Sequence, residues 1–214
     1  MIRCLFILSW LSFFHSRKPY VPRNNASFVA EDSLKQVKER LTASIRQLHP
    51  TDVIRLFPQI MNVCPAVAFT IPCIPPVGAW DHNRLSSQFG WRVHPIQGRY
   101  KHHKGIDIAG PHQLVRSTAS GTVIRAGYES GLGLYVFIDH GNSYQTIYGH
   151  LALITCTVGQ KIQIGQRLGV LGQTGQATGL HLHYAVLKSG KYLDPNDYLT
   201  VGLKFVVHHQ SANP

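Results

Sequence analysis

Charged side chains are scarce in this chain of 214 residues, because Asp, Glu, Lys and Arg together make up only 14% of it. Hydrophobic residues make up 44%, which excludes an intrinsically disordered protein, since such chains are poor in hydrophobic residues. Acidic residues are scarcer than basic ones: 10 Asp and Glu stand against 21 Lys and Arg, for a formal net charge of +11. This surplus either makes a solubilising, loosely steering surface or favours a polyanionic partner such as nucleic acid, anionic lipid or an acidic cell-wall matrix.

Several motifs that would explain the charge or bind a cofactor are also missing. There is no run of five basic residues and no RNP, zinc-finger or helix-turn-helix pattern, so no nucleic-acid partner is expected. The "GLG" at 131–133 does not make a dinucleotide-binding fingerprint. The four cysteines form no C-x-x-C, which removes the usual basis for a cysteine-based zinc site. Two alternatives follow for three of them: Cys64 and Cys73 close a disulfide loop, or Cys64, Cys73 and Cys156 are three buried free thiols.

The apolar run at the N-terminus is too short to span a bilayer comfortably. It covers Cys4 to Phe14 and has the length of a signal-peptide core. Residues 1–16 are therefore expected to be a signal peptide, and the protein to be exported to the periplasm, the cell envelope or the medium. Phe14-His15-Ser16 matches a cleavage site poorly, so an uncleaved membrane anchor is the alternative.

Residues 17–80 are predicted to be a helical segment followed by a proline-rich linker. From Ser33 to Leu48, apolar residues recur at helical spacings of three and four. A second short helix is expected after Thr51 and should end near Pro58 or Met61. The segment 65–80 is rich in proline and is expected to be an extended connector, with the domain boundary around 78–81.

The first of these helices has an apolar stripe that must be buried against something, because an isolated helix of this length is marginal in water. Its members are Leu34, Val37, Leu41, Ile45 and Leu48. The β domain, a second copy of the chain and an envelope partner are the candidates. The helix either docks over the substrate groove and inhibits, or serves as a tether that leaves the groove free. The sequence gives no indication of the oligomeric state.

Residues 81–200 have a different texture, with short runs rich in Val, Ile, Tyr and Thr separated by glycines. This pattern predicts a mainly β protein, a compact antiparallel β domain with tight turns, preceded by the short helical segment. Residues 201–214 are expected to be a C-terminal tail.

Histidines within this β region suggest a metal site. On a straight strand His103 and Asp107 would lie roughly 13 Å apart, but a bend at Gly105 would let them converge on one cation. His181 and His183 alternate, so on a strand both point to one face. Three nitrogen or oxygen ligands plus water is the pattern of catalytic zinc. The chain has 13 histidines, so an accidental grouping is the alternative.

Three motifs, in this order, resemble the lysostaphin-type (LytM-like) zinc endopeptidases of bacterial cell walls: "HKGIDIA", "YGHL" and "TGQATGLHLHY". The flanking "LSSQFGWRVHPIQG", "GTVIRAG" and "LDPNDYL" agree, so the resemblance covers roughly residues 84–199. Two positions depart from the family pattern, because Ala177 replaces a serine and Tyr184-Ala185 replaces Phe-Glu. Neither position is a ligand in the family.

The resemblance implies a Zn²⁺ ion held by His103, Asp107 and His183. It also implies that His150 and His181 are the catalytic histidines, which handle the zinc-bound water that acts as nucleophile and the oxyanion. The implied function is hydrolysis of peptide cross-links in peptidoglycan. A non-catalytic peptidoglycan-binding or amidase-activating domain of the same fold is the alternative, and a carbohydrate-binding β module is a more remote one.

Overall fold

The computed structural model describes residues 26–78, 81–96 and 98–202. The signal peptide or anchor expected at 1–16 and almost all of the tail expected at 201–214 lie outside these ranges. Among the described helices, none combines the length and the apolar character needed to cross a membrane.

Both predicted N-terminal helices are present, with wider bounds than the sequence indicated. α2 covers Ala26–Gln47 and α3 covers Pro50–Val63. α3 begins at a proline, which is favourable at the first helical position, and Asp52 in its first turn complements the positive end of the helix dipole. Its apolar face is buried through five residues: Val53, Leu56, Phe57, Ile60 and Met61.

The prediction of an extended proline-rich connector is wrong. Pro65–Ala68 form a short helix, α4, and the coil that follows is buried rather than spanning solvent. The reason is that apolar side chains lie between the prolines, and these fill the core: Val67, Ala68, Phe69, Ile71, Cys73, Ile74 and Val77. The backbone of this segment also bonds to the β domain, since the N–H of Cys73 donates to the carbonyl of Thr118. Cys64, Cys73 and Cys156 are all buried free thiols, so no disulfide closes this segment.

The remainder is a mainly β fold built on one large antiparallel sheet, as the sequence predicts. The sheet follows the order β1-β4-β11-β8-β7-β6-β9, with β10 paired to β5 and β8, and β12 paired to β11. A separate hairpin consists of β2 and β3. The strands are β1 (Leu85–Ser87), β2 (Gly90–Val93), β3 (Tyr100–His103), β4 (Ile106–Ala109), β5 (Leu114–Arg116), β6 (Gly121–Glu129), β7 (Gly133–Gly141), β8 (Tyr144–Ile154), β9 (Lys161–Ile162), β10 (Arg167–Leu171), β11 (His181–Lys188) and β12 (Lys191–Leu193). Two 3-10 turns, His82–Arg84 and Pro195–Asp197, flank the sheet.

The helices and the sheet share one hydrophobic core, because buried residues from 45–77 and from 106–199 belong to the same cluster. A buried lysine joins the helices to the sheet. Nζ of Lys188, at the end of β11, donates to the carbonyls of Ile45 (2.7 Å) and Arg46 (3.2 Å) in the last turn of α2. A cation at this position satisfies carbonyls that have no partner within the helix.

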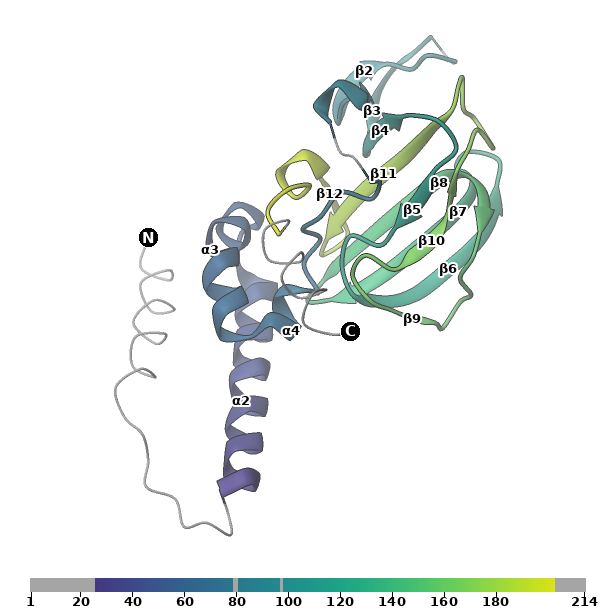
Figure 1. Cartoon of the computed structure of the whole chain (residues 1–214). Helices are drawn as coiled ribbons and strands as arrows, with labels where there is room; N and C mark the ends of the chain where they lie inside the picture. The colour runs from purple at the N-terminus through teal and green to yellow at the C-terminus, as the bar shows by residue number, and fades with distance from the viewer. Residues whose placement is uncertain (1–25, 79–80, 97, 203–214) are drawn as a thin grey trace.

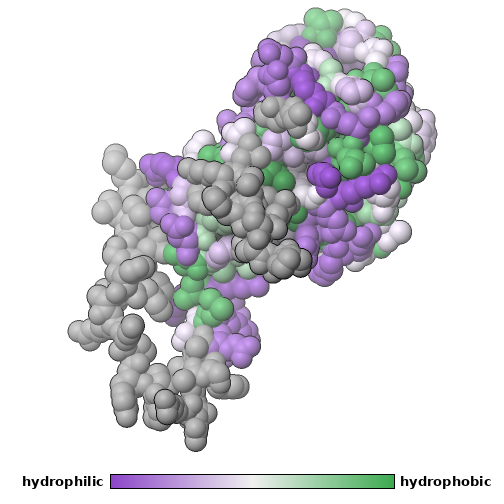
Figure 2. Space-filling view, in the orientation of Figure 1, coloured by the Kyte–Doolittle hydropathy of each residue, from purple (hydrophilic) through white to green (hydrophobic). Residues whose placement is uncertain are grey.

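The helices pack at one end of the molecule and the β2–β3 hairpin lies at the opposite end (Figure 1). The predicted apolar stripe of α2 is buried only in part, since Ile45 is inaccessible whereas Leu34 is 59% exposed. The first half of α2 extends away from the β domain (Figure 1). Figure 2 shows hydrophilic residues spread over the visible face of the β domain, with hydrophobic patches between them.

Candidate active site

A break between two strands brings His103 and Asp107 together. His103 ends β3, which pairs with β2, whereas Asp107 lies in β4, which pairs with β1 and β11. The bend expected near Gly105 is therefore present. Glycine is needed there because of space rather than backbone conformation: the backbone has no positive φ, but an added Cβ would lie 2.9 Å from Cε1 of His183 and closer still to the carbonyl of Tyr184.

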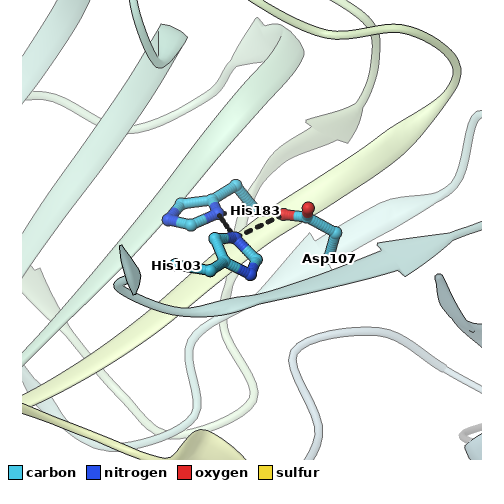
Figure 3. A group of neighbouring side chains, drawn as sticks. All are labelled: His103, Asp107 and His183. Atoms are coloured by element: carbon cyan, nitrogen blue, oxygen red, sulfur yellow. Dashed lines mark hydrogen bonds and ion pairs between the residues drawn. The ribbon is translucent and has the colours of Figure 1, made fainter. Parts of the chain in front are cut away.

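Antiparallel pairing of β4 with β11 then sets His183 directly opposite Asp107. The three candidate ligand atoms lie within 4.8 Å of one another. His183 Nδ1 is 2.9 Å from Asp107 Oδ1 and 3.1 Å from His103 Nε2, and the last two atoms are 3.2 Å apart. Figure 3 shows the two imidazoles and the carboxylate pointing toward a common point.

The imidazole of His103 has its tautomer fixed by the backbone. Its Nδ1 lies 2.8 Å from the carbonyl of Gln88, and a carbonyl oxygen can only accept, so Nδ1 carries the hydrogen. In the neutral ring Nε2 then has a bare lone pair, and it faces Asp107 Oδ1 at 3.2 Å. Two electron-rich atoms at that distance repel unless a proton or a cation lies between them.

The donor set fits a divalent metal ion. Two imidazole nitrogens and one carboxylate oxygen are three of the ligands that zinc takes in catalytic sites, and ligands at 2.0–2.2 Å from a tetrahedral ion lie about 3.3–3.6 Å apart. The observed separations of 2.9 to 3.2 Å are close to that range. The carbonyl of Gln88 is the kind of outer partner that orients metal-binding imidazoles.

Charge stabilisation acts on the carboxylate from several sides. Burial raises the pKa of Asp107, but its interactions with the adjacent His103 and His183 imidazoles outweigh burial and hold that pKa below its usual value. Burial lowers the pKa of the His183 imidazole, which favours the neutral form that a metal requires. Arg92 Nη2 lies 3.3 Å from Asp107 Oδ2, on the oxygen that does not face the histidines.

His150 is positioned by a β-bulge. Leu134 and Val136 of β7 pair with Leu151 and Tyr148 of β8, so β8 has one residue more than β7 between these pairs. At this point β8 also changes partner from β11 to β10. His150 takes up the irregularity with φ of 58°, an uncommon conformation for a residue with a side chain. Such strain is held where the surrounding structure over-determines it, frequently at functional sites.

The bulge brings the ring of His150 to 4.6 Å from the ring of His181, centroid to centroid. Both rings donate from Nδ1 to a backbone carbonyl, His150 to Thr174 (2.8 Å) and His181 to Gly179 (2.9 Å), so both have a bare Nε2. Nε2 of His181 is 3.8 Å from Asp107 Oδ1. Burial lowers the pKa of His150 to about 4, so this ring is neutral at pH 7.

The structure thus brings all five predicted site residues into one cluster. Sequence reasoning did not identify Arg92, although it lies within the quoted "FGWRVHPIQG" flank. It also missed the carbonyls of Gln88, Thr174 and Gly179, because a main-chain acceptor has no signature in side-chain sequence.

The β region is similar in sequence to known proteins. Residues 101–195 match Peptidase family M23. The chain is 42% identical over 110 residues to the peptidoglycan DD-endopeptidase ShyA of Vibrio cholerae, covering 50% of this chain and 26% of the relative. It is 38% identical over 115 residues to the DD-carboxypeptidase/endopeptidase Mpg of Neisseria meningitidis, covering 53% and 26%.

A solved structure agrees as well. The crystal structure of a zinc-containing peptidase from Vibrio cholerae superimposes with a TM-score of 0.50 at 35% identity, covering 58% of this chain and 38% of that one. The chain spans about a quarter of the length of these two curated relatives.

Proposed function

We propose that this chain, which belongs to peptidase family M23 through residues 101–195, is a zinc-dependent endopeptidase that hydrolyses peptide cross-links of peptidoglycan. One observation carries the proposal: His103 Nε2 and Asp107 Oδ1, both acceptors, face each other at 3.2 Å beside His183, an arrangement that calls for a cation. The names of the relatives support the substrate, since ShyA and Mpg are described as a DD-endopeptidase and a DD-carboxypeptidase/endopeptidase.

His103, Asp107 and His183 would hold the ion. Zn²⁺ bound there would supply Lewis acidity, polarising a carbonyl and lowering the pKa of water. Asp107 and the two imidazoles would be the three protein ligands of an open catalytic site.

His150 and His181 then act as the proton-transfer pair in the proposed mechanism. Each has its Nδ1–H tied to a main-chain carbonyl, so each ring is held in place with Nε2 free to accept a proton from water. The resulting imidazolium has an N–H to donate, either to the oxyanion that forms at the carbonyl carbon or to the departing amine. Water adds across the C–N bond, which yields one new carboxyl group and one new amine.

We further propose that the scissile bond joins two D-configured centres, as the names of ShyA and Mpg indicate for those proteins. The proposal includes export, which the apolar run from Cys4 to Phe14 supports and which a substrate outside the cytoplasmic membrane requires. Fractionation of cells that produce the tagged full chain tests the export, and a tag found in the cytoplasm would contradict it.

The decisive experiment digests defined cross-linked muropeptides with the purified full chain and identifies the products by mass. We expect a gain of one water per cut, loss of cleavage with a chelator and recovery with stoichiometric Zn²⁺. A chain that holds one zinc per molecule yet cuts none of the muropeptides would instead be the non-catalytic alternative.

A further inference from the structure

A basic cleft opens beside the candidate metal site. Its volume is about 220 Å³, and His103 and His183 form part of its wall. The other lining residues come from the β2–β3 hairpin and from the segments around 129–132 and 176: Arg92, His94, Lys101, His102, Lys104, Glu129, Gly131, Leu132 and Gln176.

The charges in this cleft are unbalanced, because three permanent cations (Arg92, Lys101 and Lys104) stand against the single carboxylate of Glu129. Arg92 is engaged with Asp107 through one amino group only, at 3.3 Å. Its Nε is buried and has no hydrogen-bond partner among the described residues. An unsatisfied buried donor of this kind is costly and suits a ligand that brings an acceptor.

The β2–β3 hairpin has an unfavourable arrangement of charges, which also supports an anionic ligand. Arg92 and Lys101 are direct partners in the β2–β3 register, so two positive side chains lie opposite each other on one face. Like charges directly opposite in an antiparallel pair destabilise it. Burial lowers the pKa of His94, and Lys101 and Arg92 lower it further, which shows that the positive potential extends along the same rim. Violations of such local rules are expected mainly at functional sites.

Lys104, which follows His103 directly in the chain, is the third permanent cation of the cleft. Its Nζ lies 5.0 Å from the centroid of the Tyr192 ring, a cation–π contact that orients the exposed side chain. Lys104 lines the same cleft as His103 and His183.

We propose that Arg92, Lys101 and Lys104 form a carboxylate subsite, which selects cross-links that carry a free carboxylate next to the scissile bond. The proposal rests on the function proposed above. In a bond between two D-configured centres, the amine-side carbon bears a carboxyl group, which is negative when it is neither amidated nor extended. A glycine bridge has no charged group there, because each of its carboxyl groups is consumed in the next peptide bond. The subsite therefore favours direct cross-links between anionic stem peptides over neutral bridges.

The test measures kcat/KM of the full zinc-loaded chain on three substrates: a direct cross-link with the free carboxylate, the same cross-link amidated, and a glycine-bridged dimer. We expect the free carboxylate to be preferred over its amide by about tenfold or more, the effect of one charge-assisted hydrogen bond. In Lys101→Met/Lys104→Met this preference should fall toward one. Lys161→Met, which removes an exposed lysine of β9, is the matched control and should retain the preference.

Binding supplies a second readout that does not depend on turnover. Calorimetric titration with the uncross-linked stem peptide should give a lower Kd for the free acid than for the amide, and the double variant should lose the difference. Equal kcat/KM and equal Kd for acid and amide would overturn the subsite while leaving the peptidase function intact. A preference reduced as much by Lys161→Met as by the double variant would also overturn it, because the effect would then be general attraction. Absence of cleavage on all three substrates contradicts the proposed function, and the titration still decides the subsite.

Discussion

At the scale of single residues, the notable feature is how main-chain carbonyls orient imidazoles. The carbonyls of Gln88, Thr174 and Gly179 each accept from the Nδ1 of a different histidine, which leaves Nε2 as the working nitrogen of His103, His150 and His181. His183 differs, because its Nδ1 faces the cluster. Fixing the tautomer by hydrogen bonding is what allows a ring to serve either as a ligand or as a proton acceptor.

The roles of these histidines are separable by substitution. His183→Ala should lose both metal and activity, because it removes a proposed ligand. His150→Ala and His181→Ala should retain stoichiometric metal and lower turnover by roughly 10²–10⁴-fold, the usual contribution of an acid–base group. Elemental analysis with muropeptide kinetics makes the comparison, and His49→Ala, an exposed histidine of the helical end, is the control. Stoichiometric metal in His183→Ala would show that the ligand set is wrong.

We expect the imidazole of His140 to make the free energy of unfolding depend on pH. It is buried, with Nδ1 donating to the carbonyl of Ser120 and Nε2 accepting from the hydroxyl of Thr146, and burial lowers its pKa from 6.5 to about 4. Below pH 6.5 the unfolded chain binds a proton that the folded chain does not. The stabilisation is therefore complete above pH 6.5 and is lost as the pH falls from there toward 4, by an amount on the order of 3 kcal/mol.

Denaturant unfolding at pH 7.5 and pH 5.0 measures this loss. His140→Gln, which has no titrating group, should be less stable than the natural chain at pH 7.5 but should show a smaller fall between the two values. His49→Gln should retain the full dependence. An unchanged dependence in His140→Gln would mean that other groups cause it.

At the scale of secondary-structure elements, the site depends on where strands begin, end and change partner. β3 ends and β4 begins on either side of Lys104 and Gly105, and β8 passes from β11 to β10 at His150. β11 lies between these two irregular points and bears both His181 and His183. Irregular strand junctions around one regular strand are thus what bring side chains from four strands, β3, β4, β8 and β11, to a single point.

Gly105→Ala tests the first junction. The added Cβ would collide with the carbonyl of Tyr184 and with the ring of His183, so we expect a loss of about 1–3 kcal/mol in stability and weaker metal binding. Gly127→Ala is the matched control, because nothing lies within 4 Å of a Cβ there. Denaturant unfolding and a zinc titration measure both effects. Equal behaviour of the two variants would contradict the close approach of β11 to the bend.

At the scale of the whole molecule, the helices are part of the β domain's core rather than a lid on its cleft. Their buried residues join the cluster of the sheet, and Lys188 ties α2 to the end of β11, five residues beyond His183. Inhibitory docking of α2 over the groove, one of the two alternatives that the sequence left open, is therefore not the arrangement seen, because the helices and the β2–β3 hairpin lie at opposite ends (Figure 1). The exposed first half of α2 agrees better with the predicted tether.

A fragment of residues 78–214 should accordingly fold poorly instead of working faster. Removing α3, α4 and the buried coil leaves the sheet residues of the shared core exposed to water. We expect lower solubility and a less cooperative thermal transition than for residues 26–214, measured by circular dichroism and dye binding. A fragment that unfolds at the same Tm and cleaves muropeptides several-fold faster would restore the inhibition hypothesis.

The sequence alone determined the mainly β fold and the amphipathic helix, because these depend on local periodicity. The grouping of His103, Asp107, His150, His181 and His183 followed from the resemblance of three motifs to a known family. The sequence did not determine that the proline-rich segment is buried. Prolines restrict φ, but whether the apolar residues beside them are buried depends on what packs against them. The sequence also did not determine whether Cys64 and Cys73 form a disulfide or, as in the structure, are free thiols. The contact of Arg92 with Asp107 and the carbonyls that orient the imidazoles were decided only by tertiary structure. Apart from the contact of His181 with Gly179, which is local, they join segments far apart in the sequence. How closely those segments approach depends on strand register, which is set by packing of the whole sheet rather than by any one segment.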